Sequence, residues 1–131
     1  MSTRPRAGSP RERWERLALG VRCAYNPEQP AVIRRFLDAG RRLEDSGALD
    51  ALAVQRRTWD LLIRTALDEA LPWPWRLACL DHTPLPRARL TTLLKRSDPA
   101  ALAAMEAQWQ AAVAAVEAAR QARSWLDDEE A

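Results

Sequence analysis

The residues best suited to chemistry lie around the single histidine of this 131-residue chain. His82 follows Cys79 by three positions and Asp81 by one, the arrangement of half a metal site or of a Cys–His pair. A zinc site needs three or four protein ligands, and only Cys23 remains to be recruited. A nucleophilic cysteine also needs a base and a group that orients that base. We therefore predict no catalytic, metal-binding or cofactor-binding residues, and a hydrogen-bonding role for His82 at a helix end.

Other signatures of enzymes are missing from the sequence. The glycines are few and not clustered, so no glycine-rich loop is present to cradle a phosphate: Gly8, Gly20, Gly40 and Gly47. No Gly-x-Ser-x-Gly turn and no paired-carboxylate motif occurs. A carboxylate or Cys/His site assembled in three dimensions from distant helices stays open. We predict that the protein is not an enzyme.

Tryptophan dominates the aromatic residues, with six against one phenylalanine and one tyrosine. Three lie on apolar helix faces and are predicted to be core residues: Trp14, Trp59 and Trp109. Trp73 and Trp75 instead stand in the proline-rich segment 72–86, where a rigid backbone could present both rings, with Arg76 beside them, to a ligand, a peptide or a base. The alternative is that the two rings fold back as a lid over the end of the helices.

Basic residues offer a second kind of binding surface. The stretch 87–96 carries four basic residues and no acidic one, and arginines in the N-terminal arm could follow a nucleic-acid groove. The helix that follows is rich in alanine and lacks base-reading side chains, so a helix-turn-helix is a poor fit. Most of these charges are explained more simply as the solvent-exposed sides of helices. The candidate nucleic-acid contacts are Arg4, Arg6, Arg87, Arg89, Lys95 and Arg96.

Length and composition set broad limits. The length is that of one domain, and a formal net charge of +2 does not demand a polyanionic partner. The longest uncharged stretch, 107–116, is far shorter than the roughly 18 residues of a membrane span. The first residues lead into a charged helix and not into an apolar signal region. We expect a cytoplasmic protein without membrane association, in which Cys23 and Cys79 are small buried thiols.

Helix start and stop signals predict an all-α fold, a single-domain bundle of five or six helices with a long Ala-rich C-terminal helix. Residues 1–8 are expected to form a flexible basic arm, residues 9–126 the helical domain and residues 127–131 an acidic tail. The third helix has the broadest apolar face and should lie centrally. The predicted elements are a first helix from Pro10 to Asn26, a second from Pro27 or Pro30 to Ser46, a third over 48–71, a helical turn over 75–81, a short helix from Pro86 and a last helix over 99–126.

The last helix carries a regular apolar seam. Its residues recur at alternating spacings of three and four, as in coiled coils: Leu102, Met105, Trp109, Ala112, Val116, Ala119, Arg123 and Leu126. One interpretation is that this seam packs antiparallel on the third helix. The other is that the part from Val116 to Leu126 overhangs the bundle and meets another subunit, with Trp125 as an anchor. The predicted interface comprises Trp109, Val116, Ala119, Arg123, Trp125 and Leu126.

These observations favour a non-enzymatic, helical protein–protein interaction module: an adaptor, an accessory subunit or a homo-oligomer. Its partner would be another protein or a second copy of the chain. The alternative is a nucleic-acid-binding accessory or regulatory protein that uses the basic segment 87–96 and the N-terminal arm.

Overall fold

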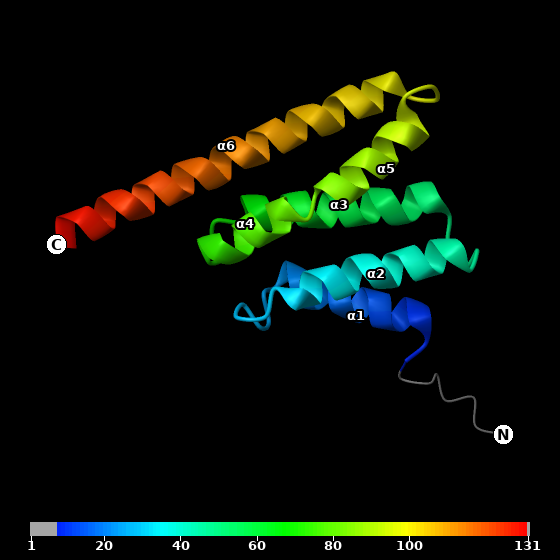
Figure 1. Cartoon of the computed structure of the whole chain (residues 1–131), viewed down its shortest axis with the longest axis horizontal. Helices are drawn as coiled ribbons and strands as arrows, with labels where there is room; N and C mark the ends of the chain where they lie inside the picture. Colours follow the sequence, from blue (N-terminus) through cyan, green and yellow to red (C-terminus); the bar gives the residue numbers. More distant parts are fainter. Residues whose placement is uncertain (1–7, 131) are drawn as a thin grey trace.

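Helix caps and prolines divide the chain into consecutive helices. The computed structural model describes residues 8–130, with side chains up to Leu126 (Figure 1). Within this range there are six α-helices and no strand, which confirms the predicted all-α class. The helices are α1 (Pro10–Arg22), α2 (Ala31–Asp45), α3 (Ala51–Leu67), α4 (Trp73–Asp81), α5 (Pro84–Leu94) and α6 (Pro99–Glu130).

Side-chain caps begin three of these helices. The hydroxyl of Ser9 accepts a hydrogen bond from the backbone N–H of Glu12 at 3.2 Å, at the start of α1. Asp50 and Asp98 cap α3 and α6 in the same way. Each cap satisfies an N–H group that has no partner within the helix. The predicted starts of the first and last helices are therefore confirmed, whereas α3 begins three residues later than predicted.

Two helices end earlier than predicted. α1 stops at Arg22, because Cys23 caps it and Ala24 adopts a left-handed conformation with φ 49°. α3 stops at Leu67, because Asp68 takes an extended conformation and its carboxylate accepts the backbone N–H of Ala70 at 3.0 Å. The connections to α2 and α4 are correspondingly longer. By contrast, α6 is longer than predicted. Its backbone stays helical through residue 130, so most of the predicted acidic tail belongs to this helix.

The segment that was predicted to be a proline-ruled loop is largely helical. α4 begins at Trp73 and α5 at Pro84, which puts Pro74 and Pro86 in the first turns of these helices. The first four N–H groups of any helix lack intrahelical partners, so a proline there removes no hydrogen bond. The expectation of a loop at Trp73 is therefore wrong, and its prolines mark helix starts.

The core forms two clusters that meet at α3. α3 contacts every other helix, which confirms its predicted central place. The first cluster joins α1, α2, α3 and α4 through Trp14, Ala18, Val21, Ile33, Phe36, Leu43, Val54, Leu61, Leu62, Trp75 and Cys79. The second joins α3, α5 and α6 through Trp59, Ile63, Ala66, Leu90, Leu94, Met105, Ala112 and Val116. The six helices thus form one domain.

α6 and α3 run in the same direction, and the predicted antiparallel packing is wrong (Figure 1). α4 and α5 together carry the chain back from the end of α3 towards its beginning. α6 then starts near the beginning of α3 and follows it. Two short helices therefore act as the return segment, and the long helix lies parallel to the central one.

The two cysteines differ in their surroundings. Cys79 is buried in the first cluster, and loss of hydration raises the pKa of its thiol to about 12. Cys23 is exposed, which contradicts the prediction that both thiols are buried. It lies outside the core because α1 ends just before it. Within residues 8–130, no helix combines the length and apolarity that crossing a membrane requires.

Candidate protein interface

The first half of α6, here taken as far as Val116, is anchored in the bundle. Asp98 caps the helix, and the alanines that follow favour helical backbone. Three side chains of this half are buried in the second core cluster, together with Trp59, Ile63 and Ala66 of α3: Met105, Ala112 and Val116. Val116, one of the predicted interface residues, is only 3% exposed. The bundle itself therefore covers the seam as far as this residue.

Trp109, another predicted interface residue, is half-buried and fixes α6 to α5. Its indole Nε1 donates a hydrogen bond to the hydroxyl of Thr83 at 3.2 Å. The guanidinium carbon of Arg87 lies 4.1 Å from the centre of its ring, a cation–π geometry. Arg87 also donates two hydrogen bonds to the carboxylate of Glu106, and this interaction lowers the pKa of Glu106. Trp109 thus makes its main polar contacts inside the molecule.

The second half of α6 projects beyond the bundle (Figure 1). Ala119 is half-buried, and every side chain from Arg120 to Leu126 is exposed. Trp125 is 72% exposed, the highest value among the exposed large hydrophobic residues, and Leu126 is 62% exposed. The predicted interface therefore divides: Arg123, Trp125 and Leu126 are accessible, whereas Trp109, Val116 and Ala119 lie wholly or partly within the bundle.

The exposed apolar surface extends along the outer side of α6. At about 100° per residue, the nine positions between Val116 and Trp125 place the two side chains on opposite sides of the helix. From residue 107 onward, six exposed residues share the outer side within about 80° of arc: Ala107, Ala111, Ala114, Ala118, Ala122 and Trp125. We call this set the outer alanine face. The spacing of the seam residues did not reveal this face, although a helical wheel of all the residues of α6 would have done so.

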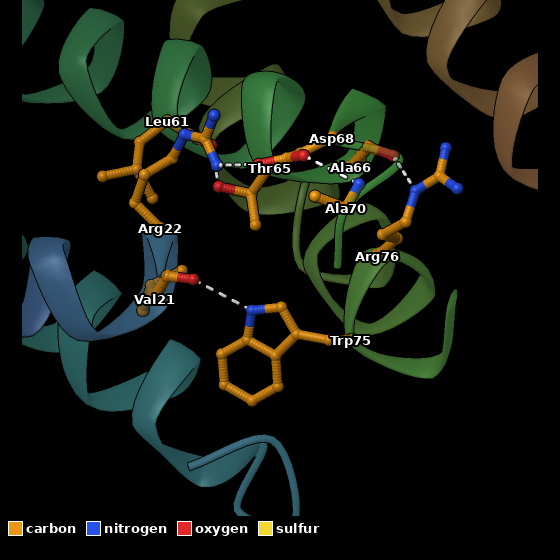
Figure 2. Close-up of polar contacts among 9 residues, drawn as sticks. All are labelled: Val21, Arg22, Leu61, Thr65, Ala66, Asp68, Ala70, Trp75 and Arg76. Atoms are coloured by element: carbon orange, nitrogen blue, oxygen red, sulfur yellow. Dashed lines mark hydrogen bonds and ion pairs between the residues drawn. The ribbon is translucent and has the colours of Figure 1, made fainter. Parts of the chain in front are cut away.

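The residues of the predicted ligand loop are mostly internal (Figure 2). Trp75 is 1% exposed, and its indole Nε1 donates a hydrogen bond to the carbonyl of Val21 at 2.9 Å. Arg76 is 4% exposed, and its Nε donates to the carbonyl of Ala66 at 2.7 Å. Trp73 is half-buried. The side chains of Trp75 and Arg76 therefore lack the accessibility that stacking on a ligand needs.

Figure 2 shows that these contacts tie three helices together at one end of the bundle. Arg22, the last residue of α1, forms an ion pair of 2.7 Å with Asp68, which follows α3. The hydrogen bond from Arg22 lowers the pKa of the Asp68 carboxyl group, and the bond from the N–H of Ala70 acts in the same direction. Since Trp75 and Arg76 of α4 bond to α1 and α3, this polar cluster has a structural role.

The candidate nucleic-acid contacts are only partly available. Arg87 is held by Glu106, and Arg89 forms an ion pair of 2.8 Å with Glu44. Lys95 and Arg96 are exposed. The other two candidates, Arg4 and Arg6, lie outside the described residues. Because carboxylates offset two of these charges, the segment 87–96 is less basic than its sequence indicates, and nucleic-acid binding stays a prediction.

His82 caps the C-terminal end of α4, as predicted. Its ring Nδ1 lies 2.7 Å from the carbonyl oxygen of Ala78, a hydrogen-bond distance. Among residues 8–126, no group of three or more histidine, cysteine, aspartate or glutamate side chains could hold a metal ion. Comparison of the chain with protein-family models, curated proteins and solved structures found no match.

Proposed function

We propose that this protein works by protein–protein contact through α6, as an adaptor, an accessory subunit or a homo-oligomer. One observation carries the proposal: α6 continues past the bundle with Trp125 and Leu126 exposed. Isolated apolar residues are normal on protein surfaces. Two adjacent large ones on a projecting helix, next to a continuous alanine face, form a more extended apolar surface.

The outer alanine face suits contact with another helix. Small side chains allow two helix backbones to approach closely, and spacings of three and four keep one side of each helix turned towards the other. Trp125 ends this face and would supply its anchor, because tryptophan is enriched among residues that dominate binding energy. Covering its exposed surface would contribute about 3 to 4 kcal/mol before the entropy cost of association.

The chain itself offers one suitable partner, a second copy. Arg120 and Arg123 precede four acidic residues at positions 127–130. When two such helix ends lie antiparallel and are centred near Ser124, Arg120 of one copy falls level with the acidic position 128 of the other, and Arg123 falls level with Trp125. A parallel pair in register would place each charge level with its own like. At about 100° per residue both arginines lie on the side of α6 away from the outer alanine face, so these charges flank the proposed contact, and they favour the antiparallel direction.

Two of the residues that could do chemistry have structural roles, which agrees with the proposed non-enzymatic function. Cys79 is buried with a raised pKa, and His82 caps a helix. Cys23 and Cys79 are both free thiols, the state that the reducing cytoplasm maintains. We propose the cytoplasm as the compartment in which this contact forms.

Sedimentation analysis of the full chain tests this proposal. We expect a concentration-dependent dimer that Ala118→Glu and Trp125→Ser each convert to a monomer, since both change the outer alanine face. Tyr25→Ser is the matched control, because Tyr25 is 62% exposed but lies in the α1–α2 connection. A wild-type chain that stays monomeric at millimolar concentration, or a dimer that both variants leave intact, would contradict self-association through this face.

A further inference from the structure

A pocket separate from the projecting helix lies between α2, α3 and α5. Its volume is about 240 Å³. Leu37 of α2 and Leu85 and Pro86 of α5 give it apolar walls, and Leu85 is 56% exposed. Gln55 and Thr58 of α3 also line it, and both are buried, at 8% and 3% exposure. The pocket thus combines apolar walls with buried polar groups, as ligand sites usually do.

A buried carboxylate organises the polar groups of this pocket. The side chain of Glu44 is only 4% exposed. One of its oxygens accepts a hydrogen bond from Nη2 of Arg89 at 2.8 Å, and the other accepts one from Nε2 of Gln55 at 2.6 Å. These bonds hold Arg89 and Gln55, both of which line the pocket, in defined positions.

Arg89 has one buried donor without a hydrogen-bond partner. Among the described residues, only two buried side-chain nitrogen or oxygen atoms lack a hydrogen-bond partner, Nε of Arg89 and Nε1 of Trp14. Trp14 lies in the core, where a methyl group built on Gly40 would come within 2.9 Å of this Nε1. Arg89 instead lines a pocket, and its side chain is 37% exposed although Nε itself is buried. Since an arginine Nε–H can only donate, this atom needs an acceptor oxygen that no described residue supplies.

We propose that this pocket binds a small, uncharged molecule with a compact apolar body and a carbonyl oxygen, which accepts the hydrogen bond of Arg89 Nε. The charge balance of the pocket favours an uncharged ligand: Glu44 offsets Arg89, and at the rim Asp38 and Arg41 are oppositely charged. The volume lies just below the usual range of about 300–1,000 Å³ for ligand sites, so the ligand is the size of a fragment.

Binding of three probes of similar size tests this proposal: cyclohexanecarboxamide, cyclohexanecarboxylate and cyclohexylmethylammonium. Two-dimensional ¹H–¹⁵N NMR reports on both the backbone amides and the Nε–H of Arg89. We expect saturable shifts of Arg89 Nε–H and of the amides of Gln55, Thr58 and Leu85 with the carboxamide. The carboxylate should bind more weakly, and the ammonium probe, which has no acceptor, should not bind.

Two variants distinguish a role of Arg89 and Thr58 in ligand binding from a purely structural role. Arg89→Lys keeps a positive charge but removes Nε–H, and should weaken carboxamide binding about tenfold. Thr58→Leu fills the pocket and should abolish binding while the chain stays folded. Arg64→Lys is the matched control and should leave binding unchanged, because Arg64 pairs with Asp60 on the exposed side of α3 and neither residue lines the pocket. Two results would overturn the proposal. One is a set of carboxamide shifts that do not saturate, as expected if only water fills the pocket. The other is equal carboxamide binding by the wild type and by Arg89→Lys.

Discussion

The guanidinium group of Arg87 lies over the ring of Trp109, 4.1 Å from guanidinium carbon to ring centre. Arg87 belongs to α5 and Trp109 to α6, so this contact sets how the long helix lies on the bundle. Glu106, one turn before Trp109, holds the same arginine through two hydrogen bonds. The direction in which the far end of α6 projects therefore depends on this small cluster.

Removing this arginine should loosen α6. Arg87→Met keeps much of the side-chain length but loses the ion pair and the cation–π contact, so we expect a loss of about 1–2 kcal/mol in the free energy of unfolding. Urea unfolding measures this loss. Arg34→Met breaks a more exposed pair with Asp38 and should cost less than about 0.5 kcal/mol. Equal effects of the two variants would show that the cluster adds no special stability.

Stability should also depend on the ionisation of Glu106. The hydrogen bond from Arg87 lowers its pKa in the folded state, so this stabilisation is present above the ordinary value of 4.5 and is lost as the pH falls through the lower, folded value. Glu106→Gln should therefore lose less stability than the wild type between about pH 5 and pH 3. Thermal unfolding at a series of pH values tests this, and parallel curves for the two proteins would argue against it.

Gly40 should not tolerate a side chain. A Cβ atom at this position would lie 2.9 Å from Nε1 of Trp14 and 3.1 Å from a methyl carbon of Val54, both of which are buried. We expect Gly40→Ala to destabilise the fold by about 1–3 kcal/mol. Gly20→Ala is the control, because its nearest neighbour would be Tyr25 at 3.8 Å and alanine favours the helix. If calorimetry shows that both variants raise the melting temperature, the packing of α2 on α1 is not as described.

The two thiols should react very differently. Cys23 is exposed, whereas burial raises the pKa of Cys79 to about 12, so its reactive thiolate is scarce at mildly alkaline pH. A disulfide reagent such as Ellman's should modify Cys23 rapidly in the native protein and reach Cys79 only after unfolding. Cys23→Ser should then show almost no native reaction. Rapid modification of this variant would mean that Cys79 is accessible.

Local signals predicted the helices best where a polar cap and a proline coincide. Ser9 and Asp98 cap as expected because capping involves residues only three positions apart. The position of α4 was harder to predict, since Pro72 and Pro74 are compatible both with a loop and with a first helical turn. The burial of Trp75 depends on a carbonyl of α1, more than fifty residues away. Such distant contacts leave no local pattern in the sequence.

The candidate interface was predictable in part. The exposure of Trp125 follows from its place near the end of a long helix with few neighbours in sequence. The residue at which α6 leaves the bundle could not be predicted from the sequence, because the spacing of the apolar seam continues unchanged through Val116 and Ala119. That point depends on where α3 stops and on the return path through α4 and α5. The parallel course of α6 and α3 depends on the same return path.

The indole N–H of Trp125 gives the most direct test of contact through α6. Its ¹H–¹⁵N resonance, assigned with Trp125→Phe, can be followed from micromolar to millimolar concentration of the full chain. We predict a saturable shift of this signal, while the indole signal of Trp75, buried and bonded to Val21, stays in place. A Trp125 signal that does not move over this range would contradict self-association through the projecting end of α6.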